Sequence, residues 1–264
     1  MRNIENWPPT DGPVRVEVSD DGAIWQVRLA TPKANIVDME KTGILSEIFS
    51  RAREARELKA VVIEAEGPHF SFGASVKEHL PGSYEAMLRG FHGLFHRMLD
   101  SSVVTLAAVR GQCLGGGLEL ASFCHRLFAS ADAHLGQPEI VLGVFAPVAS
   151  VILAERVGRS RAEDLCLSGR AIGAEEAMRI GLVDQIAEDP VEAALAYARK
   201  FLLPRSASSL RLAVRAVRAG FAERFRRELT EAERLYCDDL MSTADAVEGL
   251  EAFLAKREAA WKNA

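Results

Sequence analysis

The chain contains few cysteines and no long apolar run. Its 264 residues include 4 cysteines, no two of which form a CxxC pair, so we expect all four to be reduced and mostly buried. The longest mostly apolar stretch, residues 140–154, is interrupted by Gly143 and Pro147. It is also shorter than the roughly 20 residues that span a bilayer. Residues 1–13 lack the apolar stretch of a secretory signal peptide. These absences predict no membrane anchor and a cytoplasmic protein.

Several motifs that define other classes of site are absent as well. The sequence has neither the GxGxxG nor the GxxxxGKS/T pattern of nucleotide-binding loops, and it lacks the GxSxG pattern of hydrolases. His92 and His96 are spaced i, i+4, but no third ligand stands at a helpful spacing, so we expect no metal site. The net charge of −5 argues against a general nucleic-acid partner.

The hydrophobic pattern predicts an α/β body followed by helices. Residues 14–18 alternate with period two, and residues 24–29 follow a turn, which predicts a hairpin. Buried strands at 61–63 and 103–109 then alternate with loops and helical patterns, an order typical of an α/β fold. Strand patterns become scarce after about residue 158. We therefore divide the chain into a core that holds the functional site, residues 1–190, and a helical C-terminal region, residues 191–264.

Local signals predict where the later helices begin. Ser160 and Glu163 form a capping-box pattern, and Asp189 precedes a proline at the first helical position. Helical patterns then cover residues 193–203, 206–219, 222–240 and 245–261.

A glycine-rich loop, residues 111–120, follows the strand at 103–109. It reads Gly-Gln-Cys-Leu-Gly-Gly-Gly-Leu-Glu-Leu and leads into an apolar helical segment. Glycines let a backbone approach a ligand closely, and the N–H groups at a helix N-terminus favour negative charge. The loop suits a phosphate or an enolate oxygen, although the glycines alone are equally compatible with a tight turn that binds nothing.

Two glutamates lie in apolar surroundings. Glu119 begins the apolar helix, and Glu139 directly precedes the apolar run that starts at Ile140. Paired carboxylates with perturbed pKa values are what acid/base work on a neutral substrate requires. Each one taken alone is more often a surface group.

A third loop, residues 69–78, follows the strand at 61–63. Gly73 and its small neighbours allow backbone N–H groups to face a ligand, and an ordinary surface loop is the alternative. Together these elements resemble the enoyl-CoA hydratase/isomerase (crotonase) family over nearly the whole chain. The family patterns that match are F-x-x-G-A-D-I-K-E at this loop, G-x-x-L-G-G-G-x-E-L at residues 111–120 and F/L-G-x-P-E ending at Glu139. Two helical segments, 168–184 and 244–257, match as well.

The resemblance implies a fold, a reaction class and roles for single residues. The fold is a spiral of ββα units with a C-terminal helical region that drives trimerisation, giving a homotrimer or a dimer of trimers. The substrate is an acyl-CoA thioester, and neither a cofactor nor a metal is needed. Ala74 and Gly116 would supply the oxyanion-hole N–H groups, and Glu119 and Glu139 the acid/base pair. The residues expected to contact the CoA part are Lys33, Ala34, Gly73, Ser75, Val76 and Lys77.

Departures from the common family pattern narrow the expected substrate. Ser75 and His125 each stand where many members have Asp, and the glycine-rich P-G-x-G-G-T-Q-R segment after the second glutamate is replaced by the apolar residues 144–153. That segment would line the acyl pocket. With it, the chain is similar to the subgroup of cyclohexa-1,5-diene-1-carbonyl-CoA hydratases of anaerobic benzoyl-CoA degradation, whose product is 6-hydroxycyclohex-1-ene-1-carbonyl-CoA.

Other functions stay open. A straight-chain enoyl-CoA hydratase would use the same residues, whereas an isomerase needs one well-placed carboxylate, so the presence of both glutamates disfavours it. A non-catalytic scaffold that binds CoA or RNA is the alternative of another class. The acidic balance and the glutamate pair count against it.

Overall fold

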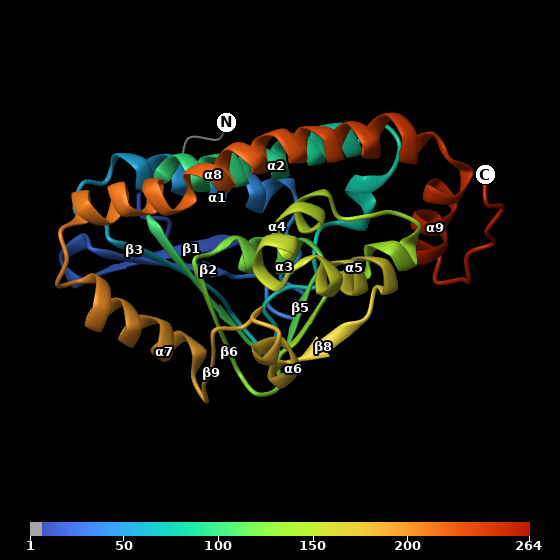
Figure 1. Cartoon of the computed structure of the whole chain (residues 1–264). Helices are drawn as coiled ribbons and strands as arrows, with labels where there is room; N and C mark the ends of the chain where they lie inside the picture. The colour runs from blue at the N-terminus through green and yellow to red at the C-terminus, as the bar shows by residue number, and fades with distance from the viewer. Residues whose placement is uncertain (1–6) are drawn as a thin grey trace.

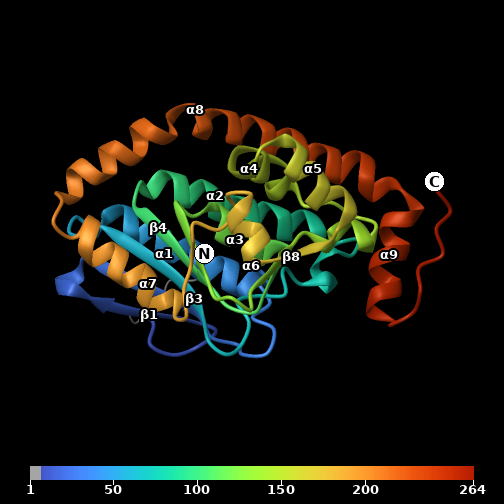
Figure 2. The same ribbon diagram turned by 60° about the horizontal axis from the view of Figure 1, so that its bottom comes forward.

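The computed structural model describes residues 7–264 and is built around a six-stranded sheet (Figures 1 and 2). The strand order is β1-β2-β3-β4-β6-β9. β1 and β2 form the predicted hairpin, antiparallel with Val14 opposite Leu29, and the later neighbours are all parallel. The strands are β1 Val14–Ser19, β2 Ile24–Leu29, β3 Ala60–Ala65, β4 Val104–Val109, β6 Arg126–Ala129 and β9 Gln185–Ile186.

A second, three-stranded sheet holds the segment around the glycine-rich loop. Its order is β5 (Gln112–Leu114), β7 (His134–Gly136) and β8 (Ala171–Gly173), with β5 parallel to β7 and β8 antiparallel to it. Helices follow the strands of both sheets, as expected for repeated ββα units. They are α1 Met39–Glu54, α2 Tyr84–Ser101, α3 Gly116–Phe123, α4 Pro147–Val157, α5 Arg159–Ser168 and α6 Ala174–Arg179.

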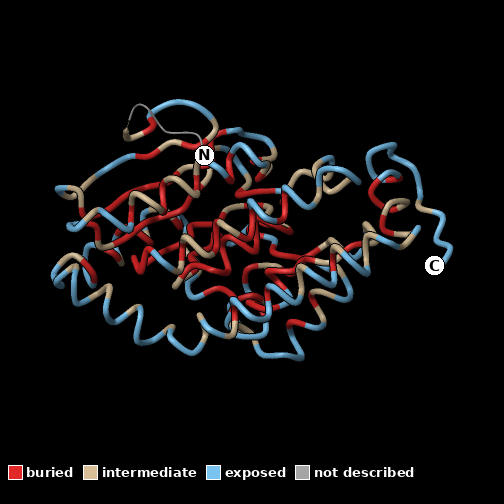
Figure 3. Tube along the Cα trace, turned by 90° about the horizontal axis from the view of Figure 1, so that it is seen from above, coloured by how far each residue is buried: buried red, intermediate tan, exposed pale blue. Residues whose placement is uncertain are grey.

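Side chains on the two faces of the large sheet enter different apolar clusters. Successive residues of a strand point to opposite faces, so Val27 and Ile63 pack among the buried residues of α1–α4. Ile24 and Val62 pack on the other side, against α7 (Pro190–Tyr197) and the π-helical turn Ala198–Leu202 that continues it. Both faces are therefore covered, as parallel sheets require. Figure 3 shows the buried strands and the exposed outer helices.

The C-terminal helices extend across the molecule. α8 (Ala207–Arg234) runs along one side of it, over α2 and α4, to the end where α9 (Ala244–Leu254) lies (Figure 1). The two separate helices predicted at 206–219 and 222–240 are wrong in part: α8 is one helix, and a π-helical turn, Leu235–Asp239, continues it. A single interior glycine, Gly220, costs only about 1 kcal/mol in a helix and does not end it.

The predicted helix at 245–261 ends early, at Leu254. Two carboxylates of α9 hold the following backbone in another conformation. Asp245 accepts hydrogen bonds from the N–H groups of Lys262 and Asn263, at 2.7 and 2.6 Å, and Glu248 accepts one from Ala260 at 2.8 Å. The tail is thus bound back onto the helix rather than continuing it.

One of the two predicted helix starts is confirmed. The Asp189 carboxylate accepts from the N–H groups of Val191 and Glu192, at 2.9 and 3.1 Å. The prediction for Ser160 is wrong, because α5 already begins at Arg159 and no side chain caps it. Gly158, with φ +78°, turns the chain directly from α4 into α5 and itself occupies the N-cap position, where it has no side chain that could accept a hydrogen bond.

Within residues 7–264, no helix has the length and apolar character needed to cross a bilayer.

Candidate active site

The two glycine-containing loops touch one another backbone to backbone. Gly73 has φ +101°, and a Cβ built on it would lie 3.1 Å from the carbonyl oxygen of Leu114. A Cβ on Gly116 would lie 3.2 Å from the amide nitrogen of Ala74. Larger residues at Gly73 and Gly116 would force the loops apart. The structure therefore brings Ala74 and Gly116 together, as the family pattern predicts.

Ser71 holds these loops in register. Its N–H donates to Gln112 O at 3.0 Å, and its carbonyl accepts from Leu114 N–H at 2.9 Å. Its buried hydroxyl donates to Asn35 O at 2.8 Å and accepts from Gly73 N–H at 3.0 Å. Every polar group of Ser71 is thus used to fix the relative positions of three segments.

The N–H groups of Ala74 and Gly116 remain free. In the part of the chain that is described, neither donates to a protein acceptor. Gly116 is also the first residue of α3, where the helix dipole adds positive potential. Two neighbouring free N–H donors of this kind can stabilise an oxyanion.

Glu119 lies in the first turn of α3 and is 4% exposed. Its Oε1 accepts a hydrogen bond from Ala149 N–H at 2.7 Å, and the neighbouring Val148 N–H also favours the ionised carboxylate. Both N–H groups belong to the first turn of α4, which Pro147 opens. Burial raises the pKa of Glu119 to about 7, against the opposing effect of these donors. Glu119 therefore titrates near neutral pH.

Glu139 lies in the short 3₁₀ turn Pro138–Leu142 and lines a cavity. A Cβ on Gly115 would come within 2.5 Å of its Oε1, so the carboxyl rests directly on the glycine-rich loop. Burial and the charge of Glu119 raise the pKa of Glu139 to about 8. Gln137, which is 1% exposed, can turn its amide nitrogen toward this carboxyl, at 2.9 Å from Oε2 and 3.2 Å from Oε1.

The cavity beside Glu139 has a volume of about 510 Å³. The expected CoA-contact residues Gly73, Ser75, Val76 and Lys77 line it, as does Ala74. His79 also lines it, and burial lowers the pKa of this imidazole, whose Nδ1 lies 2.8 Å from Ser75 O. The α9 side chains Leu250, Phe253 and Leu254 close one side.

Lys33 and Ala34 do not line this cavity. Lys33 is exposed and has φ +98°. The Ala34 carbonyl accepts a hydrogen bond from Phe72 N–H at 2.9 Å. This segment therefore supports the loop that carries Gly73 without lining the cavity.

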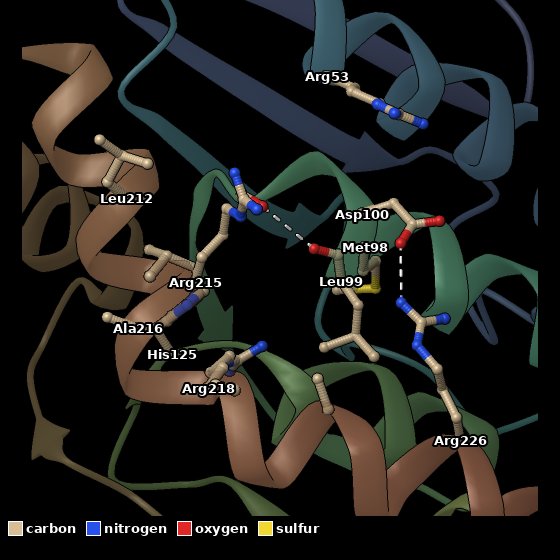
Figure 4. A pocket seen from close by; sticks show the side chains of 14 residues that line it. Arg53, Met98, Leu99, Asp100, His125, Leu212, Arg215, Ala216, Arg218 and Arg226 are labelled. Carbon is tan, nitrogen blue, oxygen red and sulfur yellow. Dashed lines mark hydrogen bonds and ion pairs between the residues drawn. The ribbon is translucent and has the colours of Figure 1, made fainter.

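A larger cavity, of about 930 Å³, lies elsewhere (Figure 4). Arginines of α1 and α8 line it, together with His125 and the end of α2, and neither glutamate reaches it. His125, which replaces the family Asp, accepts from Thr105 N–H at 3.0 Å through Nδ1. Burial lowers the pKa of His125 to about 3, so it is neutral. This departure from the family pattern lies outside the glutamate cavity.

The histidines considered as metal ligands have other partners. His92 Nδ1 lies 2.5 Å from Glu233 Oε2, and His96 Nδ1 lies 3.3 Å from the Arg226 guanidinium. Over residues 7–264, no group of three or more His, Cys, Asp and Glu side chains is placed to hold a metal. Cys113 and Cys124 are buried, Cys166 and Cys237 half-buried, and all four are free.

The raised pKa values of the two carboxyls predict a pH dependence of stability. In the unfolded chain both glutamates ionise near 4.5, but in the folded chain near 7 and 8. Between these values the folded state binds more protons, so the free energy of unfolding falls as the pH rises. Stability from this source is complete below about pH 4.5 and lost above about pH 8.

We expect the midpoint of thermal unfolding to fall between pH 5 and pH 8 in the wild type. In Glu139→Gln this fall should be smaller by several degrees. Calorimetry of both proteins at three pH values measures this difference. Parallel curves for the two proteins would contradict a desolvated Glu139 carboxyl.

The family profile described as Enoyl-CoA hydratase/isomerase matches residues 19–264. The chain belongs to the enoyl-CoA hydratase/isomerase family.

Several relatives in this family match almost the whole chain. Cyclohexa-1,5-dienecarbonyl-CoA hydratase of Thauera aromatica is 52% identical over 251 residues, which are 95% of this chain and 97% of that protein. A probable enoyl-CoA hydratase of Mycobacterium bovis is 33% identical over 247 residues, 91% of this chain and 95% of that protein. The crystal structure of enoyl-CoA hydratase from Bacillus halodurans matches with a TM-score of 0.84 at 19% identity, covering 91% of this chain and 100% of that one. This likeness confirms the predicted fold class.

Other residues that support the site of this family member carry no motif in the sequence. They are Ala149, whose N–H donates to Glu119, Gln137, whose amide can face Glu139, and the α9 side chains that line the cavity. Pro147, a typical first residue of a helix, is the available signal for the Ala149 donor. Nothing in the sequence alone indicates that Leu250 or Phe253 reaches the loop at Gly73.

Proposed function

We propose that this protein hydrates cyclohexa-1,5-diene-1-carbonyl-CoA to 6-hydroxycyclohex-1-ene-1-carbonyl-CoA. The observation that carries the proposal is the pair of protonatable carboxyls, Glu119 and Glu139, beside two free backbone N–H groups. A hydratase needs one group to take a proton from water and another to give one to carbon. The identity to the Thauera aromatica enzyme supports the choice of a cyclic diene.

The pKa values of the two carboxyls determine which one acts as the base and which as the acid. The two N–H donors of α4 favour the ionised form of Glu119, whereas the charge of Glu119 disfavours ionisation of Glu139. In the singly protonated pair, Glu119 is therefore the carboxylate and Glu139 the acid. The pair titrates as one coupled system, and hydration is fastest between the two apparent pKa values.

The reaction then balances without a cofactor. Glu119 removes a proton from water as the oxygen bonds to the β-carbon of the diene. The electrons move to the thioester oxygen, and the dienolate is held by the N–H groups of Ala74 and Gly116. Glu139 donates its proton to the vinylogous carbon of the dienolate. The thioester carbonyl re-forms, and the one remaining ring double bond lies between the α-carbon and the carbon next to the protonated one. Transfer of the proton from Glu119 to Glu139, directly or through water, restores the starting state.

Several further expectations belong to this proposal. Gly73, Ser75, Val76 and Lys77 contact the thioester and pantetheine part of the substrate, with Lys33 and Ala34 behind them. The enzyme acts in the cytoplasm without a metal. The chain divides into the core of residues 1–190 and the helical region of residues 191–264. A homotrimer or a dimer of trimers assembles through the helical region.

The experiment that tests the function uses the purified protein with cyclohexa-1,5-diene-1-carbonyl-CoA in water, and crotonyl-CoA in parallel. Liquid chromatography with mass spectrometry measures the gain of one water. We expect rapid gain on the ring diene and slow gain on crotonyl-CoA. Rapid hydration of crotonyl-CoA with an inert diene would contradict the proposal and favour a straight-chain hydratase. Tight binding without turnover of either thioester would favour a scaffold.

A further inference from the structure

Four arginines line the cavity of about 930 Å³ that lies between α8 and the ends of α1 and α2 (Figure 4). Arg53 comes from α1, and Arg215, Arg218 and Arg226 come from α8. Among the described residues that line the cavity, Asp100 is the one carboxylate, so three positive charges are in excess. The whole chain, in contrast, has a net charge of −5. The cavity is therefore a local concentration of positive charge, with a volume in the range of small-molecule sites.

Three of the four guanidinium groups have no carboxylate partner. Asp100 pairs with Arg226 at 2.8 Å. No carboxylate within residues 7–264 forms an ion pair with Arg53, Arg215 or Arg218. Their charges are therefore available to a ligand.

Other arginines of α8 have the partners that these lack. Arg224 pairs with Glu155 at 2.6 Å. Arg211, one turn before Arg215, donates to three backbone carbonyl groups at the ends of α1 and α2, at 2.8, 2.9 and 2.6 Å. Those carbonyl groups therefore do not require Arg215, and the structure gives its guanidinium no other role.

Arg218 is the most costly of these cations in the folded chain. Its half-buried guanidinium donates to Phe123 O at 2.9 Å and lies over the Phe123 ring. Burial lowers the pKa of Arg218 to about 10, so its charge is disfavoured. Arg211, Arg215 and Arg218 are also spaced by four and three residues, which places like charges side by side on one helix face. An anion bound among them would offset both costs.

The cavity also contains one of the departures from the family pattern. His125, which stands where many members have Asp, lines it. Its Nδ1 accepts from Thr105 N–H at 3.0 Å, so Nε2 carries the hydrogen, for which no residue in the described part of the chain provides an acceptor. Burial and the charges of Arg218 and Arg156 keep this imidazole neutral. A neutral donor thus replaces a carboxylate that would have balanced part of the positive charge.

We propose that this cavity binds a small anion with two phosphoryl groups, such as pyrophosphate or the diphosphate of a nucleotide, through Arg53, Arg215 and Arg218. Guanidinium groups match phosphate oxygens with paired hydrogen bonds. A phosphate group carries about −1.5 to −2 charges at pH 7, so two such groups balance the excess. The bound anion connects α8 to α1, because its ligands come from both helices. This inference is independent of the proposed function, since neither glutamate lines the cavity.

Calorimetric titration of the full chain with sodium pyrophosphate, at constant ionic strength, tests the site. We expect Arg215→Gln and Arg53→Gln each to raise the Kd at least tenfold, the effect of one charge-assisted hydrogen bond. Both side chains are exposed, so both variants should fold. Inorganic phosphate should bind at least tenfold more weakly than pyrophosphate. Equal affinity for the two anions would overturn the assignment of two phosphoryl groups.

Arg227→Gln is the matched control for these variants. It removes the same charge from α8 outside the cavity, where Arg227 pairs with Glu228 at 3.3 Å, and we expect a Kd within twofold of the wild type. If it weakens binding as much as Arg215→Gln does, the affinity reflects net charge alone and the site is refuted.

Exchange of His125 tests the charge argument at a second position. His125→Asp places a carboxylate in the cavity, and we expect it to raise the Kd for pyrophosphate about tenfold while raising the midpoint of thermal unfolding without ligand. His125→Asn is the neutral control, because an amide oxygen can still accept from Thr105 N–H, and its Kd should stay within twofold. Equal weakening by both variants would contradict the role of charge.

Two other occupancies would overturn the proposal. If pyrophosphate binds at the loop of Lys77, which lines the cavity beside Glu139, Lys77→Gln removes the binding and Arg215→Gln does not. If a carboxylate of a second copy of the chain pairs with these arginines, the wild type does not bind pyrophosphate, and Arg215→Gln lowers the mass measured by light scattering. Binding that requires Arg215 at an unchanged mass supports the proposal.

Discussion

Glu119→Gln and Glu139→Gln are each expected to lower kcat for hydration by about 10²–10⁴, with little change in the Kd of the product. Glutamine keeps the size of each side chain but can neither accept nor deliver the proton. The double variant should lose far less than the product of the two single effects, because groups that act as a unit are not additive. Initial rates with the ring diene, measured from pH 6 to pH 9, check this prediction.

Glu64→Gln is the matched control for these two variants. Glu64 is also buried, at 5% exposed, and burial raises its pKa as well. It lies on β3 and accepts a hydrogen bond from Arg28 at 2.9 Å, not in the cavity. We expect this variant to lose stability while keeping kcat. If it lost activity as strongly as the other two, removal of a buried carboxylate would explain the effect, and the acid/base assignment would fail.

Gly115→Ala is expected to lower kcat about a hundredfold, the scale of losing one well-placed catalytic group. Its Cβ would lie 2.5 Å from Glu139 Oε1, so the carboxyl must leave its position. The backbone at Gly115 has φ +52° and ψ −128°, which L-residues rarely adopt. We therefore also expect a loss of stability of about 1–3 kcal/mol. Rates and thermal unfolding of the same preparation measure the two effects.

Gly22→Ala is the control that separates the effect of backbone strain from the effect of displacing the Glu139 carboxyl. Gly22 has φ +86°, but a Cβ there meets nothing within 4 Å. This control should lose stability and retain kcat. A Gly115→Ala protein with full activity would show that the position of Glu139 relative to this loop does not matter for the reaction.

Local features of the sequence predicted much of the fold. The alternation at residues 14–18 and 24–29 is confirmed as the β1–β2 hairpin, and the Asp189-Pro190 pair does begin α7. Each of these depends on neighbours in the chain. The Ser160 signal failed because Gly158 had already turned the chain, and the helix expected beyond Leu254 failed because Asp245 and Glu248 hold the tail through hydrogen bonds from residues far along it.

The candidate site was predictable where family motifs mark it and not where distant segments meet. Motifs located Ala74, Gly116, Glu119 and Glu139, and the structure places them around adjoining loops. No spacing rule, however, brings Ala149 to Glu119 or Leu250 to the cavity beside Glu139. These contacts depend on where α4 begins and on where α9 packs, which are properties of the packed chain. The roles of the site residues remain predictions for the experiments above.

The group that holds Glu119 belongs to the peptide backbone. Ala149 donates through its N–H group, the neighbouring Val148 N–H also favours the ionised carboxylate, and every residue except proline carries such a group. Most codon changes at these positions would therefore change buried side chains behind the glutamate without removing the backbone N–H groups. Inherited variation can thus repack this part of the core while the carboxylate keeps its backbone partner. An engineer seeking new thioester substrates should instead randomise cavity-lining residues such as Val144, Leu250 and Phe253, and leave Glu119 untouched.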